Sequence, residues 1–382
     1  MKKLLITSTD LMMIQFLVPH VKHLSENGFH VEIACSVVGD RIDDVRRALE
    51  GYAKAIHIVR LERSPVSPNN LKGYGDMKRL LAENHYDIIW TNEPVMGVVT
   101  RLAARKLRKA GTRVLYMCHG FHFFDGASLP NWLIFYPVER IMAHFCDGII
   151  TMNREDYDRA RTFKTCPVYK IPGVGVDMNR FHFQNAPDLR IAKRIQLGLP
   201  QDAYVLLSVG ELTKRKNQEV ALHALKKLAD PSIHYVLCGK GDLREHLEQV
   251  AAELGLTDRV HFLGYRLDVP EMYRMADCFV FPSVHEGLPF ALMEAMESGL
   301  PIVCSRIRGN VDLIDDQVGG ILCGVHNSDD YYTAIRKVQG MDLPKMVAHN
   351  RRKLTEFDLS NTRHLIEKIL TNDDGAENGG EA

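Results

Sequence analysis

The sequence lacks an excess of charge of either sign, a metal-binding cysteine spacing and a long apolar run. Its 382 residues contain 48 Lys and Arg and 48 Asp and Glu. This balance argues against a general affinity for nucleic acid, which usually requires a basic excess. No CxxC motif occurs among the eight cysteines, so no zinc-site spacing is present. No apolar run reaches the length of about 18 residues that would indicate a membrane-spanning helix.

The cysteines are scattered, and several lie within apolar runs such as YVLCGKG and DCFVFPS. This placement favours buried free thiols in a reducing cytoplasm. The apolar part of the opening stretch MKKLLITSTD is too short for a signal peptide and indicates a first buried strand. Hydrophobic residues make up 46% and charged residues 25% of the chain, as in an ordinary soluble globular protein, so we expect a cytoplasmic location.

Short β-branched or apolar runs alternate with longer helical patterns along the chain. Such alternation predicts the α/β class, with parallel sheets covered by helices on both faces. The expected strands lie at 3–8, 31–36, 55–60, 86–92, 113–119, 147–153 and 168–173 in the first half, and at 204–210, 234–241, 260–265, 278–283, 301–306 and 319–324 in the second.

So many strands predict two doubly wound, Rossmann-like domains rather than one sheet. The segment 172–200 is rich in Pro, Gly and polar residues and is the expected boundary. We therefore assign an N-terminal domain to 1–175 and a C-terminal domain to 176–345. A helical segment at about 346–371 is expected to pack back on the first domain. The acidic, Gly-rich end, 372–382, is expected to be a disordered tail.

Polar or Gly-bearing loops follow four predicted strands of the second half, and ligands of open α/β sheets bind at those strand ends. The first of these loops carries Lys214, Arg215 and Lys216. Three cations there suit a diphosphate, since charge-assisted bonds to phosphate are strong. The alternative is that these three cations are merely solvent-exposed residues at the start of a helix. Cations at a helix N-terminus oppose the helix dipole, which argues against this alternative.

The stretch HEGLPFALMEAM places Glu286 just before a predicted helix and Glu294 within it. Pro289 suits the first turn, and the amides near Gly287 and Leu288 would form a helix N-terminus able to bind phosphate. A carboxylate on each side could accept hydrogen bonds from two sugar rings. The alternative is that Glu294 is a surface residue and Glu286 merely interacts with the helix dipole.

Three further features have competing interpretations. His119 follows a predicted strand and precedes a glycine, with His122 as the competing histidine. The DYD triplet at 156–158 mimics a metal-binding motif, but it follows Asn153, a good N-cap, and is better interpreted as the acidic start of a helix. The segment 129–145 is interpreted as a buried helix pair broken at Pro137, whose exposed edge could touch lipid.

These motifs resemble the retaining glycosyltransferases of family 4, which have the GT-B architecture of two Rossmann-like domains facing a central cleft. The resemblance rests on E-G-x-P-x-x-x-x-E at 286–294, together with GELTKRKNQ, GKGDLREHLE, VHFLGYRLDV, MADCFVFPS and GLPIVCSRIRGNVDLI in the family's order. The first-half segments HGFHFFDGA and NWLIFYPVERIMAHFCDGIITMNREDYDRA are similar to bacterial exopolysaccharide and capsule enzymes of the EpsD-like subgroup.

The resemblance implies that the N-terminal domain, 1–175, binds the acceptor and that the C-terminal domain, 176–345, binds the nucleotide sugar. It also implies a role for each candidate residue. Catalytic roles fall to His119, facing the sugar, and to Glu286, contacting hydroxyls of the transferred sugar. The implied donor-binding residues are Lys216 with Arg215 at the diphosphate, Gly287, Leu288 and Pro289 through backbone amides, Glu294 at the ribose, and Tyr265 and Arg266 at the base. Two departures stand out: Glu211 occupies the family's usual Arg position, and TSTDLMMIQ replaces the usual glycine pair of the first loop.

The activity implied is transfer of a hexose or N-acetylhexosamine from a nucleotide diphosphate sugar, expected to be a UDP-sugar, with retention of configuration. The implied acceptor is a lipid-linked saccharide of exopolysaccharide, capsule or O-antigen synthesis, reached at the inner face of the cell membrane. We expect no cofactor, no catalytic metal and no nucleic-acid partner. The alternatives are a nucleotide-sugar epimerase, a non-catalytic nucleotide-sugar-binding protein, and a dehydrogenase, the last lacking GxGxxG after the first strand.

Overall fold

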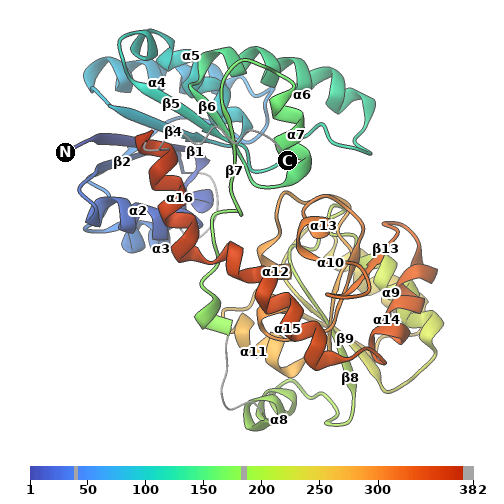
Figure 1. Ribbon diagram of the computed structural model, residues 1–382. Helices are drawn as coiled ribbons and strands as arrows, with labels where there is room; N and C mark the ends of the chain where they lie inside the picture. The colour runs from blue at the N-terminus through green and yellow to red at the C-terminus, as the bar shows by residue number, and fades with distance from the viewer. Residues whose placement is uncertain (38–41, 182–186, 373–382) are drawn as a thin grey trace. The chain divides into compact units, whose positions relative to one another are not determined.

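The computed structural model describes residues 1–37, 42–181 and 187–372, so the predicted tail, apart from Asn372, lies outside the described residues. The chain divides into two compact units (Figure 1). Unit 1 consists of Met1–Gly175 together with the C-terminal segment from Ser360, and unit 2 consists of Val176–Leu359.

Unit 1 contains a seven-stranded parallel sheet in the order β3-β2-β1-β4-β5-β6-β7. The chain runs from β1 outward through β2 and β3 and then returns to place β4 on the other side of β1. The topological switch point of this sheet therefore lies between β1 and β4. The strands are β1 Lys3–Asp10, β2 His30–Ser36, β3 Ala55–Ile58, β4 Ile88–Asn92, β5 Arg113–Met117, β6 Gly148–Thr151 and β7 Val168–Lys170.

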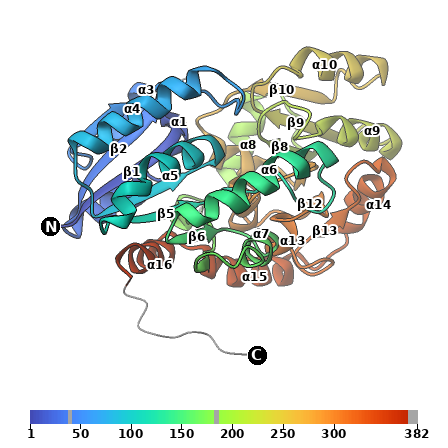
Figure 2. The same ribbon diagram turned by 90° about the horizontal axis from the view of Figure 1, so that it is seen from above.

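Helices cover both faces of the unit 1 sheet (Figure 1 and Figure 2). Its central strands are buried on both faces, which explains their nearly continuous apolar sequence. The helices are α1 Leu11–Ile14, α2 Val18–Glu26, α3 Ile42–Leu49, α4 Asn69–Glu83, α5 Pro94–Lys109, α6 Leu129–Met142, α7 Arg154–Arg161 and α16 Leu359–Thr371, with a 3-10 turn η1 at Ala143–Phe145.

The segment 129–145 is not the predicted buried helix pair. It forms one helix, α6, which continues through Pro137 into η1. Trp132, Phe135 and Tyr136 pack against the core of unit 1, whereas Leu133 is 67% exposed. The sequence prediction failed because a proline can be accommodated inside a helix where tertiary packing holds the flanking turns.

A buried ion pair links α5 and α6 inside unit 1. The Arg101 Nη2 atom donates to Glu139 Oε2 at 2.9 Å, and both residues are buried. The Tyr116 hydroxyl donates to the other Glu139 oxygen at 2.9 Å, and the Arg101 guanidinium lies 3.9 Å from the centre of the Tyr116 ring. The charges are therefore satisfied by each other, which is the condition under which buried charges are tolerated.

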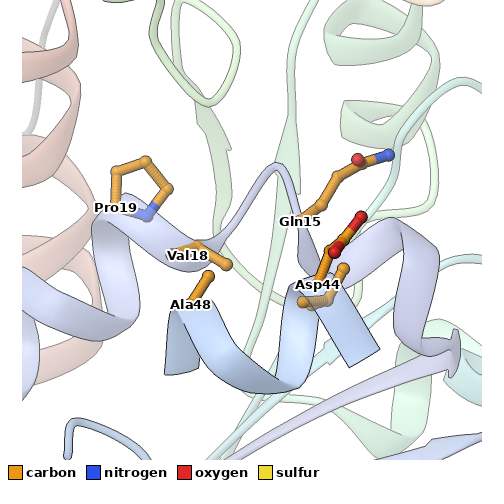
Figure 3. Close-up of a pocket in the computed structure, with 6 residues that line it drawn as sticks. Gln15, Val18, Pro19, Asp44 and Ala48 are labelled. Carbon is orange, nitrogen blue, oxygen red and sulfur yellow. The ribbon is translucent and has the colours of Figure 1, made fainter. Parts of the chain in front are cut away.

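A pocket with a volume of about 270 Å³ lies between the start of α2 and α3 in unit 1 (Figure 3). Apolar side chains form most of its wall, and its carboxylate, Asp44, is paired with Arg47 at 2.6 Å. None of the predicted site residues lines it. The lining residues are Gln15, Val18, Pro19, Asp44, Val45 and Ala48.

Unit 2 contains a six-stranded parallel sheet in the order β10-β9-β8-β11-β12-β13. Its switch point lies between β8 and β11, because β9 and β10 extend one way from β8 and β11 follows on the other side. The strands are β8 Tyr204–Val209, β9 Ile233–Cys238, β10 Val260–Gly264, β11 Cys278–Phe281, β12 Ile302–Ser305 and β13 Ile321–Cys323. The described residues thus form the predicted strands of both halves.

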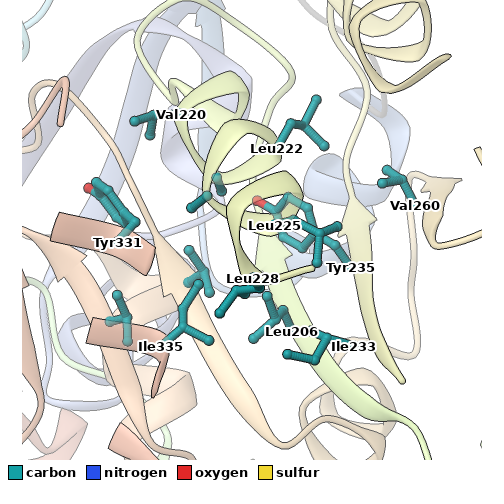
Figure 4. Packing of buried hydrophobic residues seen from close by; sticks show 14 of the residues in the cluster. Leu206, Val220, Leu222, Leu225, Leu228, Ile233, Tyr235, Val260, Tyr331 and Ile335 are labelled. Carbon is teal, nitrogen blue, oxygen red and sulfur yellow. The ribbon is translucent and has the colours of Figure 1, made fainter. Parts of the chain in front are cut away.

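The core of unit 2 packs the sheet against helices α9 and α14, where Leu225, Tyr331 and Ile335 meet strand residues such as Leu206 and Tyr235 (Figure 4). The helices of unit 2 are α8 Pro187–Gln196, α9 Gln218–Leu228, α10 Arg244–Glu253, α11 Val269–Met275, α12 Phe290–Glu297, α13 Asn310–Leu313, α14 Ser328–Val338 and α15 Leu343–Leu354, with 3-10 turns η2 at Met178–Phe181 and η3 at Thr355–Phe357.

The C-terminal helices divide between the units. The prediction gave the whole segment 346–371 to the first domain, but α15 belongs to unit 2, where it packs against α12. Helix α16 belongs to unit 1, where its Ile366 and Leu370 side chains are fully buried. The helical pattern is similar in both segments, so periodicity alone did not show where the chain crosses back.

The cysteines are free thiols, seven of them buried and Cys166 half-buried, as the sequence indicated. Among the described residues, no helix combines the length and apolar character needed to cross a membrane.

Candidate functional site

A buried ion pair lies across the switch point of unit 2. Lys216 follows β8 and Glu286 follows β11, so the two residues come from opposite sides of the switch point. The Lys216 Nζ atom lies 2.6 Å from Glu286 Oε1, and Arg215 Nη1 lies 2.9 Å from Oε2. The Glu286 residue is only 7% exposed. Three residues predicted from two separate loops are thus in direct contact.

Burial and charge act in opposite directions on this pair. Burial raises the pKa of the Glu286 carboxyl, but the nearby Lys216 and Arg215 cations outweigh it and hold that pKa below its usual value. Burial lowers the pKa of the Lys216 ammonium, and the Glu286 charge only partly offsets this. A dianionic group entering here would meet cations already stripped of much of their water, which strengthens the attraction.

Backbone contacts fix the loop that carries the cations. Asn217 adopts a left-handed conformation with φ 53°, and its Nδ2 atom donates to the carbonyls of Pro282 at 3.1 Å and Val325 at 2.9 Å. The Val284 amide donates to the Arg215 carbonyl at 2.8 Å. The loop after β8 is therefore tied to the loop after β11, which holds Lys216 beside Glu286.

The loop after β12 supports Glu286 from another direction. The Arg308 Nε atom donates to the Glu286 carbonyl at 3.1 Å. Gly309 has φ 78°, and a Cβ atom there would lie 2.5 Å from the carbonyl oxygen of Gly287. Only glycine permits this approach of the two loops. The backbone at Gly287 and Leu288 is thereby held at the start of α12.

Helix α12 begins one residue later than predicted. Pro289 is its N-cap, with φ −82° and ψ 118°, and the first helical residue is Phe290. The shift leaves the general arrangement intact, because the first-turn amides still lack partners within the helix. Glu294 is half-buried, and the Tyr273 hydroxyl donates to its Oε2 atom at 2.9 Å. Burial raises the pKa of the Glu294 carboxyl, opposed by the Tyr273 hydrogen bond.

The loop after β10 presents Tyr265 and Arg266. Tyr265 is 53% exposed, so about half of its surface is accessible to a ligand. The Arg266 Nε atom donates to Asp268 Oδ1 at 2.8 Å, and Lys193 Nζ lies 2.8 Å from the other Asp268 oxygen. Arg266 is therefore paired with Asp268, which holds its guanidinium in this loop.

One of the two departures from the family pattern, Glu211, lies in the loop after β8. Glu211 is exposed, and its carboxylate lies 3.9 Å from Arg215 Nη2, so it competes weakly with Glu286 for that cation. Lys214 is exposed. Lys216 is thus the most buried of the three predicted cations, and Arg215 lies beside it.

His119 lies in unit 1, after β5, at the carboxyl edge of that sheet. Its Nε2 atom lies 2.9 Å from Asn92 Oδ1, and burial lowers the pKa of the imidazole to about 4. A neutral ring at physiological pH follows, able to donate or accept a hydrogen bond. The competitor His122 instead stacks on Phe135 of α6, with ring centres 4.6 Å apart.

Two groups of residues bear on metal binding. Asp156 is buried, accepts from Asn153 Nδ2 at 2.7 Å, and starts α7, which Asn153 caps. Among the described residues, His23 of α2 and His364 and Glu367 of α16 offer ligand atoms within 4.8 Å of one another. His23 Nε2 is paired with Glu367 Oε2 at 2.7 Å, which accounts for these side chains without an ion.

Sequence reasoning missed several residues that shape these sites. Tyr273, Arg308 and Asn92 act through contacts between elements far apart in sequence, and no local pattern marks them. Asn217 offered a signal, since asparagine tolerates the left-handed conformation, and it follows the three cations directly.

Both halves of the chain match known families. Residues 17–180 match the family described as Glycosyltransferase Family 4, and residues 190–353 match Glycosyl transferases group 1. EpsD of Bacillus subtilis (strain 168), named as a glycosyltransferase, is 32% identical over 342 residues, covering 88% of this chain and 87% of that protein. A protein of Escherichia coli named UDP-Gal:alpha-D-GlcNAc-diphosphoundecaprenol alpha-1,3-galactosyltransferase is 28% identical over 338 residues, covering 86% and 85%.

A solved structure resembles the whole chain in fold. Alr3699/HepE of Anabaena, in complex with UDP and glucose, has a TM-score of 0.80 at 20% identity and covers 97% of this chain and 100% of its own. The fold is therefore the GT-B arrangement of two Rossmann-like parallel-sheet units, and the predicted fold class is confirmed.

Proposed function

The chain belongs to the glycosyltransferases of family 4, and on this premise we propose that it transfers a sugar from a UDP-sugar to an acceptor hydroxyl. The observation that supports the donor class best is the buried pair of Lys216 and Glu286 across the switch point of unit 2, with Arg215 beside it. A diphosphate needs cations, and a sugar needs a hydrogen-bond acceptor. This pair supplies both at one place.

Each predicted donor residue has a role in this proposal. Lys216 and Arg215 bind the diphosphate together with the backbone at Gly287, Leu288 and the start of α12. Glu286 accepts hydrogen bonds from the transferred sugar, and Glu294, steadied by Tyr273, accepts them from the ribose. Tyr265 and Arg266, in the loop after β10, pack on the base. His119 of unit 1, neutral because of its lowered pKa, hydrogen-bonds the sugar.

The reaction breaks the bond between the anomeric carbon and the diphosphate oxygen and forms a new bond to the acceptor oxygen. The proton of the acceptor hydroxyl passes to the departing diphosphate, which leaves as UDP. Negative charge accumulates on the departing diphosphate, so cations and amides placed there stabilise the transition state. We propose retention of configuration, a hexose or N-acetylhexosamine as the transferred sugar, and no cofactor or catalytic metal.

The choice of UDP and of a lipid-linked acceptor rests on relatives. HepE was solved with UDP and glucose, and the Escherichia coli relative is named for UDP-Gal and a diphosphoundecaprenol acceptor. We propose a lipid-linked saccharide as acceptor, used in exopolysaccharide, capsule or O-antigen synthesis, at the inner face of the cell membrane.

A screen of nucleotides for thermal stabilisation tests the donor. A UDP-sugar at a hundredfold its dissociation constant should add about 2.7 kcal/mol to the free energy of unfolding.

The Glu294→Gln variant should bind UDP about tenfold more weakly, because a hydrogen bond to a charged acceptor is replaced by a hydrogen bond to a neutral one. Both effects can be measured by differential scanning fluorimetry and calorimetry.

A matched control is Glu248→Gln, which changes an exposed carboxylate of α10 that pairs with Arg244 within the same helix. This variant should bind UDP like the wild type. Stabilisation by NAD with none by UDP-sugars would contradict the proposed donor class.

The outer face of α6 suits an anionic membrane surface. Leu129, Leu133, Ile134 and Ile141 are between 56% and 70% exposed, and they repeat at helical spacing along one side. Exposed apolar residues gathered in this way usually mark an interaction surface. Arg140 on the same helix is also exposed.

Cations adjoin this apolar face at the end of α5. The Arg108 Nη1 atom donates to the His144 carbonyl just after α6, at 2.7 Å, which places the last turns of α5 beside the end of α6. Arg105, Lys106 and Lys109 are exposed there. Apolar side chains flanked by cations fit a bilayer with anionic headgroups.

Changing both Leu133 and Ile141 to Ser should lower binding to phosphatidylglycerol vesicles by about tenfold or more, because two large apolar side chains no longer enter the interface. Vesicle co-sedimentation measures this. The control changes Val66 and Leu71 to Ser, which are 88% and 77% exposed elsewhere on unit 1. The proposal would be contradicted if the two double variants bound phosphatidylglycerol vesicles equally well. It would also be contradicted if the wild type bound phosphatidylcholine vesicles as well as phosphatidylglycerol vesicles.

A further inference from the structure

Unit 1 places a carboxylate at its own switch point. Strand β1 ends in Ser8, Thr9 and Asp10, and Glu93 directly follows β4, the strand on the other side of the switch point. Ligands of open α/β sheets bind at such points. Unit 2 has the same arrangement, with Glu286 after the strand across its switch point. No role was predicted for Glu93 from the sequence.

The Glu93 side chain reaches across the switch point instead of capping its own helix. Glu93 is the N-cap of α5, but its side chain makes no capping hydrogen bond. Its Oε2 atom accepts from Ser8 Oγ at 2.5 Å and from the Thr9 amide at 2.9 Å. Both bonds go to one oxygen, and no hydrogen bond joins Oε1 to any residue in the described ranges.

The backbone of Glu93 is held in an unusual conformation, with φ 65° and ψ 159°. A non-glycine residue in this region is strained, and such residues persist only where the surrounding structure imposes them. The following Pro94 begins α5 directly. The strain directs the carboxylate back over the end of β1 rather than along the helix.

The neighbouring groups are already committed to other partners. Asp10 of β1 is fully buried, its Oδ2 accepts from Arg63 Nε at 2.7 Å, and its Oδ1 accepts from the Met13 amide at 3.0 Å. Asn92 faces His119 at 2.9 Å. Burial raises the pKa of Glu93 to about 7, with the Asp10 charge adding to this and the Ser8 and Thr9 bonds and Arg63 opposing it.

We propose that Glu93 binds a hydroxyl of the acceptor saccharide through Oε1, while Ser8 and Thr9 hold Oε2. The inference rests on the proposed function, since it names where the acceptor is recognised in unit 1. Glu93 is a specificity-determining residue here, because its Oε1 atom accepts a hydrogen bond from one particular hydroxyl of the sugar. The ligand class is a neutral, hydroxyl-bearing sugar ring.

The test measures binding of octyl glycosides of glucose, galactose, N-acetylglucosamine and N-acetylgalactosamine to the full-length protein by saturation-transfer NMR and calorimetry. At pH 8, where the Glu93 carboxyl with its pKa of about 7 is mostly ionised, we expect the wild type to bind at least one of them. Glu93→Gln should bind it about 10- to 100-fold more weakly, since a hydrogen bond to a charged group is lost. The exposed Glu83→Gln at the end of α4 should bind like the wild type. Binding of none of the four, or unchanged binding by Glu93→Gln, would overturn the proposal.

A second measurement separates recognition from support of the fold. Deoxy analogues of the best glycoside, each lacking one hydroxyl, are titrated against the wild type and Glu93→Gln. One analogue should lose affinity for the wild type by the same factor as the substitution, and Glu93→Gln should not distinguish it from the parent glycoside. Equal affinities of the wild type for every analogue would overturn the proposal, even if Glu93→Gln proved unstable. Stabilisation by UDP tests the donor site separately, so the failures of the two proposals can be told apart.

Discussion

Replacing Lys216 by methionine is expected to lower kcat for sugar transfer by about 10²–10³-fold, the effect typical of removing one group that stabilises developing charge. Methionine keeps most of the side-chain volume and removes the cation. It also leaves Glu286 buried with Arg215 as its remaining partner, which disfavours a diphosphate further. UDP release in a coupled assay, with donor saturating, measures kcat directly.

The matched control is Lys214→Met, two residues away in the same loop and exposed. It should change kcat by no more than about twofold, because an exposed cation is screened by water and salt. If Lys216→Met kept kcat within tenfold of the wild type, Lys216 would not be the cation at the leaving group, and the assignment of the diphosphate site would fail.

Replacing Glu139 by leucine is expected to reduce the free energy of unfolding of unit 1 by about 3–5 kcal/mol, since it leaves the Arg101 charge buried without its partner. Arg101 is 0% exposed, so water cannot take the place of the carboxylate. Urea titration followed by tryptophan fluorescence reports on unit 1 specifically, because both tryptophans, Trp90 and Trp132, belong to it.

The comparison variant changes both partners, Arg101→Met with Glu139→Leu. Removing a buried pair together is far less damaging than removing one member, so the double variant should recover most of the lost stability. A single variant as stable as the wild type would show that the pair contributes nothing to unit 1. A double variant less stable than the single would show that Arg101 supports the core through packing, including its contact with Tyr116, more than through charge.

The local patterns of this chain were sufficient to predict its strands but not their partners. Apolar runs bounded by Gly and polar residues located the strands of both sheets, because strands buried on both faces are nearly continuous in apolar residues. The order of strands depends on which segments pair, and this is long-range information. The crossing of the chain at Leu359, between two similar helical segments, is another long-range feature.

The candidate site divides in the same way. Sequence patterns were sufficient to predict Lys216, Glu286 and Glu294. Lys216 and Glu286 lie in loops that follow predicted strands, and Glu294 lies in the predicted helix just after Glu286. Glu93 was not, because its position depends on a left-handed φ that glutamate rarely adopts, and its side chain contacts β1, more than 80 residues earlier. The exposed side of α6 was predicted only as an edge of a buried helix pair, because an apolar helix has the same sequence pattern whether its side chains pack in a core or face outward.

The discontinuity of unit 1 has a consequence for biosynthesis. Ribosomes synthesise a chain from its N-terminus, so all of unit 2 is synthesised before α16. Until then the first unit lacks the helix that buries Ile366 and Leu370 and whose Leu370 carbonyl accepts from Arg113 at 3.1 Å. During about the second half of translation, unit 1 therefore lacks the helix that covers part of its apolar core, and the unit that is begun first is completed last.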